Sequence, residues 1–173
     1  AIDEVVGLLS RAEKPIMIIG DRLAGANVDA VRLAETAGIP VYGHGSAEVN
    51  FPASHPLWQG NLSVRAPQAI EAIRSADLIL AIGCTVFDDF FSQPGSVIGP
   101  GTSLVHIDSD PGSIGKSEPT DIGILAAPPA VVSQLADAVS EIFTGTRAEE
   151  AALRVREAKA ASTARREAFG RSA

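Results

Sequence analysis

Two short apolar runs, each closed by a glycine, constrain the fold of this chain more than any other feature. One lies within Lys14–Gly20 and the other within Asp77–Gly83, and in both the apolar residues follow one another without polar residues between them. A strand with one face in solvent alternates apolar and polar residues, whereas a strand covered by helices on both faces is apolar throughout. The two runs therefore predict strands of a parallel sheet that lies between two layers of helices.

Weaker patterns along the rest of the chain alternate between strand and helix. Further strands are predicted at Ile39–Tyr42, Ser103–Asp108 and Asp121–Ala126, with a short one near Trp58–Gly60. Helical segments are predicted at Ile2–Arg11, Val28–Ala37, Pro67–Ser75 and Pro128–Phe143, with a short helical turn near Gly112–Lys116. Parallel strands need helical crossovers, so this order predicts an α/β fold: a doubly wound, mostly parallel six-stranded sheet of Rossmann-like topology.

Two residues mark the expected ends of the second helix. Asn27 is predicted to be its N-cap, because an Asn side chain can accept a hydrogen bond from a free N–H group of the first turn. Gly38 is predicted to end it, because glycine adopts the left-handed conformation that closes many helices.

The end of the chain differs in composition from the rest. Residues 1–146 carry 7 basic and 17 acidic groups, a net charge of −10, whereas residues 147–173 carry 7 basic and 4 acidic groups, a net charge of +3. The segment Arg147–Phe169 is strongly helical, but its apolar residues are mainly Ala, so we expect it to bury little against the domain. The chain is therefore predicted to comprise a domain over 1–146 and a linker helix over 147–173.

The same features exclude several classes of protein. No apolar run approaches the roughly 20 residues that a membrane span needs, and no signal peptide is recognisable at the start. The acidic body argues against nucleic acid as a partner, because phosphates require a basic face. The single cysteine, Cys84, allows no intramolecular disulfide, which favours the cytoplasm.

Glycines and polar residues follow the predicted strands, where open α/β sheets bind their ligands. Gly20, Arg22, His44, Gly83 and Asp108 are the candidate residues for an FAD or ADP-containing group. Glycine would allow close approach of a phosphate, and an aspartate could bind a ribose hydroxyl. The spacing does not match G-x-G-x-x-G, so ordinary strand-to-helix turns explain these glycines equally well.

Other candidate chemistry has a structural explanation beside it. Cys84 could be a nucleophile or a small buried residue, and His106, inside a strand, is interpreted as a hydrogen-bonded core residue. The pairs Asp88-Asp89 and Asp108-x-Asp110 could hold a divalent cation, but neither supplies the ligands of a known loop. No catalytic residue and no metal site is predicted.

Several segments in the same order resemble the central domain of thiamine-diphosphate-dependent enzymes. They are Lys14–Gly20, Leu33–Val41, Phe51–Gly60, Ala76–Gly83, Val86–Asp88 and Val105–Pro111. The resemblance covers roughly residues 1–143. Within the family, the segments Cys84–Phe87 and Pro100–Leu104 look most like benzoylformate decarboxylase, and acetolactate synthase shares the outline.

The resemblance implies a domain that does not itself carry the chemistry. In such enzymes two other domains bind thiamine diphosphate with Mg²⁺, and the chain lacks their Gly-Asp-Gly…Asn motif. The resemblance implies that this chain sets the distance between those two domains of the same polypeptide. It also implies that the chain supports a homodimer or homotetramer of a 2-keto acid decarboxylase or lyase. The alternative is an FAD- or ADP-binding module, although Val86 stands where flavin-binding relatives usually carry Arg. An independent enzyme of the NAD-dependent deacylase or deoxyhypusine synthase type shares this topology and is a third alternative.

Overall fold

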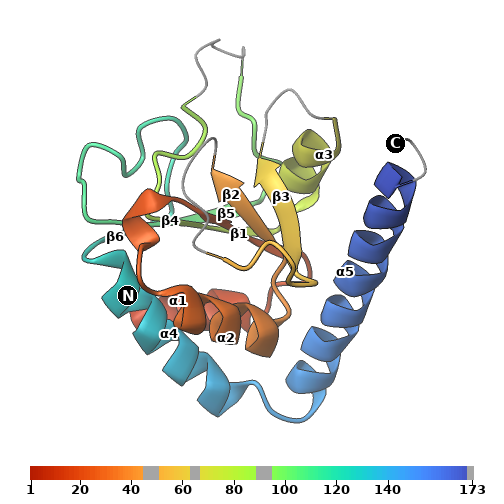
Figure 1. Ribbon diagram of the computed structural model, residues 1–173. Coiled ribbons are helices and arrows are strands. Elements are labelled where there is room, and N and C mark those ends of the chain that lie inside the picture. The colour runs from red at the N-terminus through yellow and green to blue at the C-terminus, as the bar shows by residue number, and fades with distance from the viewer. Residues whose placement is uncertain (45–50, 63–66, 89–94, 171–173) are drawn as a thin grey trace.

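A single parallel sheet organises the molecule. The computed structural model describes residues 1–44, 51–62, 67–88 and 95–170, and Figure 1 shows its helices around a central sheet. The sheet has six strands in the order β3-β2-β1-β4-β5-β6, and every neighbouring pair is parallel. The strands are β1 (Pro15–Ile19), β2 (Val41–His44), β3 (Trp58–Leu62), β4 (Leu78–Ile82), β5 (Ser103–Asp108) and β6 (Ile122–Leu125). The predicted fold class is confirmed.

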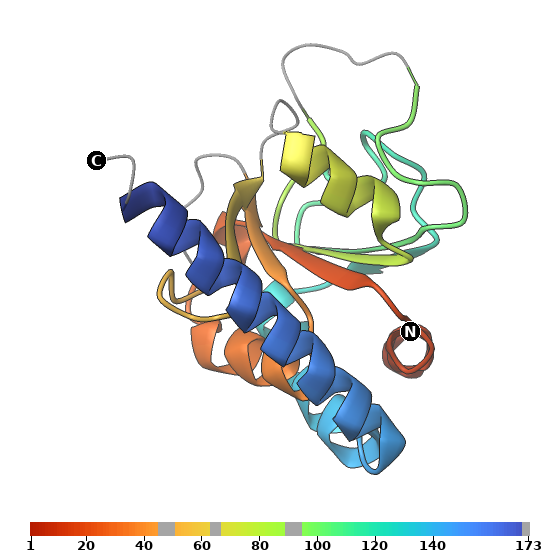
Figure 2. The same cartoon turned by 90° about the vertical axis from the view of Figure 1, so that its right-hand side faces the viewer.

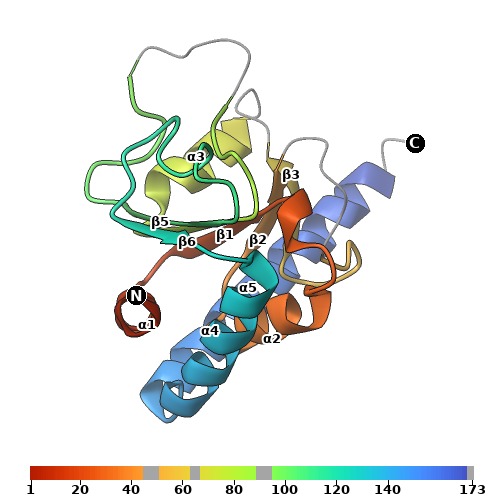
Figure 3. The same ribbon diagram turned by 90° about the vertical axis from the view of Figure 1, so that its left-hand side faces the viewer.

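Helices cover both faces of the sheet, as a doubly wound fold requires. On one face lie α1 (Ile2–Leu9), α2 (Asn27–Ala37) and α4 (Pro128–Ile142), and Figure 3 shows α4 between the other two. On the other face lies α3 (Pro67–Ser75). The last helix, α5 (Thr146–Gly170), runs past the β2–β3 side of the sheet (Figure 2).

Successive residues of the central strands serve two separate cores. In β1, Met17 and Ile19 belong to the large core under α1, α2 and α4, whereas Ile16 and Ile18 belong to the smaller core under α3. All five residues of β1 and of β4 are buried. The unbroken apolar runs therefore have the physical cause inferred from the sequence, because side chains on both faces of the strand must leave water.

The element boundaries differ from the predicted ones at a few positions. The expected cap at Asn27 is wrong: α2 begins at Asn27 itself, Ala26 precedes it, and no side chain caps the helix. Gly38 does end α2, with φ +63°. The second strand starts and ends two residues later than predicted. Residues 111–115 form turns rather than a helix, and the 3-10 turn at Asp21–Leu23 was not predicted.

The last helix packs more closely on the domain than its composition suggested. Ala151, Ala158 and Ser162 are buried, and they lie on one face of α5. A Cβ on Gly38 would lie 2.8 Å from the Cα of Ala151, so the two backbones touch. Small residues permit this approach, which a count of large apolar residues overlooks. The proposed domain limit at residue 146 stays a prediction.

Candidate functional site

The turns that follow β1 and β4 pack directly against each other at the carboxyl edge of the sheet. The Gly20 N–H donates to the Ile82 carbonyl at 3.0 Å, and the Arg22 N–H donates to the Gly83 carbonyl at 3.1 Å. A Cβ on Gly20 would lie 2.5 Å from the Cβ of Cys84, and one on Gly83, where φ is +66°, would lie 2.7 Å from the Leu23 nitrogen. Both glycines are therefore needed for the close packing of the turns.

Arg22 and Asp108 form a bidentate ion pair at the same edge. Nε of Arg22 donates to Oδ1 of Asp108 at 2.6 Å, and Nη2 donates to Oδ2 at 2.7 Å. The Asp108 side chain is fully buried, whereas 35% of the Arg22 side chain is exposed. The hydrogen bond that Arg22 donates to Asp108 is the main reason that the pKa of Arg22 is raised above its ordinary value. A planar guanidinium opposite a carboxylate is the strongest arrangement such a pair can adopt.

Three further polar side chains surround this pair. Nη2 of Arg22 also donates to Ser113 Oγ at 2.9 Å, and Thr85 Oγ1 lies 2.7 Å from the same hydroxyl. Ser113 in turn donates to Oδ2 of Asp110 at 2.9 Å. The pKa of Asp110 is lowered, first by the N–H of Gly112 and then by Ser113. The network joins the ends of β1, β4 and β5 through side chains that satisfy one another.

The five predicted binding residues are thus divided between two places. Gly20, Arg22, Gly83 and Asp108 meet at one point, as the strand order predicts. His44 instead lies with its Nε2 atom 3.2 Å from Oδ1 of Asp88. Phe87, which precedes that carboxylate, has φ +60°, an uncommon value for a residue with a side chain. Thr85 and Ser113 carry no sequence signal, since an isolated hydroxyl residue in a loop is ordinary.

Cys84 and His106 are core residues, and the His106 ring bonds to the main chain of Cys84. Nε2 of His106 lies 2.8 Å from the Cys84 carbonyl, so this ring nitrogen carries the proton. Burial lowers the pKa of His106, and burial likewise raises the pKa of Cys84 to about 12. A thiol with that pKa is almost entirely protonated at neutral pH, which argues against a nucleophilic Cys84. The interpretation of His106 as a core histidine is confirmed.

The carboxyl edge fits a nucleotide poorly. On the side where a Cβ would point, Gly20 and Gly83 each contact the opposite turn, so a phosphate cannot approach them from that side. Asp108, the candidate for a ribose hydroxyl, is fully buried against Arg22. Over the described residues, no group of three or more His, Cys, Asp or Glu side chains could hold a metal ion.

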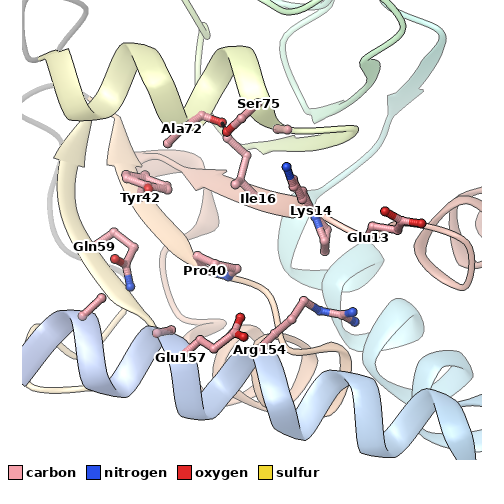
Figure 4. Close-up of a pocket in the computed structure, with 14 residues that line it drawn as sticks. Glu13, Lys14, Ile16, Pro40, Tyr42, Gln59, Ala72, Ser75, Arg154 and Glu157 are labelled. Atoms are coloured by element: carbon pink, nitrogen blue, oxygen red, sulfur yellow. Dashed lines mark hydrogen bonds between the residues drawn. The ribbon is translucent and has the colours of Figure 1, made fainter.

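The opposite edge of the sheet contains a pocket that the sequence did not reveal. It has a volume of about 340 Å³ and lies between α3, α5 and the amino ends of β1 and β2. Figure 4 shows Ile16, Pro40 and Tyr42 between the two helices, with Arg154 and Glu157 extending from α5. Lys14 and Glu13 also line the pocket. Charges of both signs therefore surround an apolar floor.

Arg154 connects α5 to the end of α2. Its Nη2 donates to the Ala37 carbonyl at 2.8 Å and its Nε donates to the Gly38 carbonyl at 3.2 Å. The last carbonyls of a helix have no partner within the helix and carry a partial negative charge, so a cation there is favourable. Burial lowers the pKa of Arg154, even though Glu150, Asp77 and Glu157 act against it.

The fold and the carboxyl edge define a class of protein: an open α/β domain with a six-stranded parallel sheet of Rossmann-like order, in which the polar residues of the carboxyl edge bond to one another. Residues 2–135 match the family model "Thiamine pyrophosphate enzyme, central domain". The chain therefore belongs to the family of thiamine-diphosphate-enzyme central domains. No helix within the described ranges is both long enough and apolar enough to cross a bilayer.

Similar proteins are much longer than this chain. A probable acetolactate synthase large subunit of Methanocaldococcus jannaschii is 32% identical over 127 residues, which is 72% of this chain and 21% of that protein. A sulfoacetaldehyde acetyltransferase of Rhodobacter capsulatus is 35% identical over 140 residues, or 76% of this chain and 23% of that protein. The chain thus spans about a fifth of the length of these relatives.

A solved structure gives the same result. The thiamine diphosphate-dependent 4-hydroxybenzoylformate decarboxylase of Rhodococcus jostii RHA1 superposes with a TM-score of 0.72 at 28% identity. The match covers 83% of this chain and 28% of that one. The predicted resemblance to this family is confirmed.

Proposed function

We propose that the chain is the non-catalytic central domain of a thiamine-diphosphate-dependent decarboxylase or lyase that acts on a 2-keto acid. The observation that carries the proposal is the family match over residues 2–135, which covers the whole sheet. In the longer enzyme, thiamine diphosphate would supply the nucleophilic carbon that such a reaction needs, and Mg²⁺ would accompany it. Other domains of the same polypeptide would bind both.

The chain's own residues support a spacing role. Arg22, Thr85 and Asp108 tie the ends of β1, β4 and β5 together through partly buried hydrogen bonds. A domain that holds two others at a set distance needs this rigidity, because a small misplacement of reacting groups slows a reaction greatly. The longer enzyme would be a homo-oligomer. It would work in the cytoplasm, because the one cysteine of this chain is free and buried and needs no oxidising compartment.

A flavin or ADP group is the less favoured alternative. The mutual packing of Gly20 and Gly83 and the pairing of Arg22 with Asp108 leave these groups committed within the protein. Titration of FAD into the purified chain, followed by flavin fluorescence, is expected to show no change at roughly 100 μM, since useful cofactor affinities are tighter. Saturable quenching would restore the alternative.

The main proposal is tested by turnover. The purified chain is given saturating thiamine diphosphate, Mg²⁺ and either pyruvate or benzoylformate, and release of carbon dioxide is measured. We expect none above the protein-free control. Measurable release would contradict a non-catalytic role. A reading frame that continues past Ala173 into a Gly-Asp-Gly…Asn motif would support the proposal, and a stop codon there would overturn it.

A further inference from the structure

We propose that the first two thirds of α5, Thr146–Ser162, are a strap that docks reversibly on the domain and is latched by Arg154 at the carboxyl end of α2. The strap forms one wall of the pocket at the amino edge of the sheet. This inference concerns a moving part of the domain, and it holds whichever reaction the longer enzyme performs.

The latch is a single guanidinium on two main-chain oxygens. Arg154 reaches the carbonyls of Ala37 and Gly38, at 2.8 Å and 3.2 Å. Because α2 ends at Ala37, that carbonyl has no partner in its own helix. Both residues are buried while α5 is docked. Their oxygens carry only partial charges, however, so departure of Arg154 leaves no buried carboxylate unpaired. The contact has a specific geometry, and opening it costs less free energy than separating a buried ion pair would.

The rest of the docked face is too small to hold α5 firmly. Its buried side chains are Ala151, Ala158 and Ser162, and the partly buried Val155 also packs against the core. By contrast, α4 buries Val131, Val132, Leu135 and Val139. Stabilisation by burial grows with the apolar area removed from water, so α5 gains far less from packing than α4 does. The strap therefore depends on its latch, and α4 does not.

Release of the strap would change the pocket. α5 contributes Arg154, Glu157, Ala158 and Ala161 to the lining, opposite Ile16 and Tyr42 of the sheet. When α5 leaves, that wall leaves with it, and the apolar floor opens to solvent. The pocket therefore exists only while α5 is docked.

Hydrogen exchange by mass spectrometry on the whole chain tests the latch. A helix released from its partner is marginally stable in water, so the amides of α5 exchange when the strap opens. Arg154→Ala is expected to speed exchange in residues 150–162 about tenfold. The reason is that the variant loses a favourable charge at the end of α2 together with its hydrogen bonds. Amides of α4 should keep their protection. Arg154→Lys, which keeps the charge but cannot span both carbonyls, should give a smaller increase.

The matched control is Arg156→Ala, which removes an exposed arginine from the same helix. We expect its exchange to stay within about twofold of the unmodified chain. If Arg154→Ala behaves like Arg156→Ala, the latch does not exist. If Arg154→Ala exposes α4 as strongly as α5, then α5 is part of the global unfolding unit, and the strap is equally contradicted.

A second variant approaches the same contact from α2. Gly38→Ala would place a Cβ 2.8 Å from the Cα of Ala151, and it should speed exchange in α5. Gly25→Ala is its control, because Gly25 also has positive φ but has nothing within 4 Å of the added carbon. Faster exchange of α5 in Gly38→Ala alone supports the strap. Equal behaviour of the two variants argues against it.

Discussion

The two edges of the sheet hold a partly buried arginine in opposite ways. At the carboxyl edge Arg22 faces the buried carboxylate of Asp108, and its pKa is raised. At the amino edge Arg154 faces two helix-end carbonyls, and its pKa is lowered by burial. If Arg22 leaves Asp108, a charged carboxylate stays unpaired in the interior, which is costly. If Arg154 leaves its two carbonyls, only partial charges lose their partner, and the guanidinium can return to water. The first edge is locked and the second can open.

The largest expected effect comes from unlocking the carboxyl edge. Arg22→Ala leaves Asp108 buried without its partner, which should lower the free energy of unfolding by about 3–5 kcal/mol. Urea denaturation followed by circular dichroism measures this.

Its control is Arg32→Ala, which removes ion pairs to Asp29 and Asp137 on the surface between α2 and α4. That loss should stay below about 1 kcal/mol. A loss of similar size in both variants would show that the edges differ less than their geometry indicates.

The close packing of the two turns at the carboxyl edge gives the next effect. Gly20→Ala would force a Cβ to within 2.5 Å of the Cβ of Cys84 and 2.6 Å of the Gly83 carbonyl oxygen. Overpacking of this kind should cost about 1–3 kcal/mol, read from the denaturation midpoint.

Gly7→Ala in α1 is the matched control, because the nearest atom to its added carbon is 3.5 Å away. It should stabilise the protein by about 0.5–1 kcal/mol, since alanine is the better helix residue. If Gly20→Ala is tolerated as well as Gly7→Ala, the turns are looser than their hydrogen bonds imply, and a phosphate could approach Gly20.

The smallest expected effect is a pH dependence of the free energy of unfolding, caused by His106 near the carboxyl edge. Burial lowers the pKa of His106, so the unfolded chain binds more protons than the folded one below pH about 6.5. Stability is therefore complete above that pH and falls as the pH decreases toward the folded pKa. Between pH 7 and 5.5 the loss should reach at most about 1 kcal/mol.

Urea titrations at both pH values, with His106→Gln as the comparison, measure this loss. The variant should be less stable at pH 7 but should show a flatter dependence on pH. An unchanged slope would assign the effect to another group. Asp110, whose pKa is lowered, acts in a separate and more acidic window: its stabilisation is present above pH about 4 and is lost as the pH falls below that.

The central strands were predictable because their cause is local. Every residue of β1 and β4 is buried, so the apolar run alone marks them. The end of α2 at Gly38 was equally readable. The start of α2 was not, because Asn27 makes no capping hydrogen bond and packing of the helix decides where it begins. Propensity is a weak signal wherever tertiary contacts compete with it.

The candidate site was predictable only as a set of positions. Strand ends placed Gly20, Arg22, Gly83 and Asp108 on one edge, and the structure brings them together. Arg22 bonds to other residues of the same edge, among them Ser113 and Thr85. These two residues lie 91 and 63 residues from Arg22 in the chain. No local pattern announces such partners.

By itself the sequence determined the parallel sheet, its two-sided burial and the glycine turns at its carboxyl edge. Each of these follows from residues within a few positions of one another, through periodicity and backbone freedom. Only the tertiary structure decided that Asp108 receives Arg22 and that α5 docks through Arg154 and Ala151. Those contacts join segments far apart in the chain, and their strength depends on burial and charge that exist only once the chain has folded.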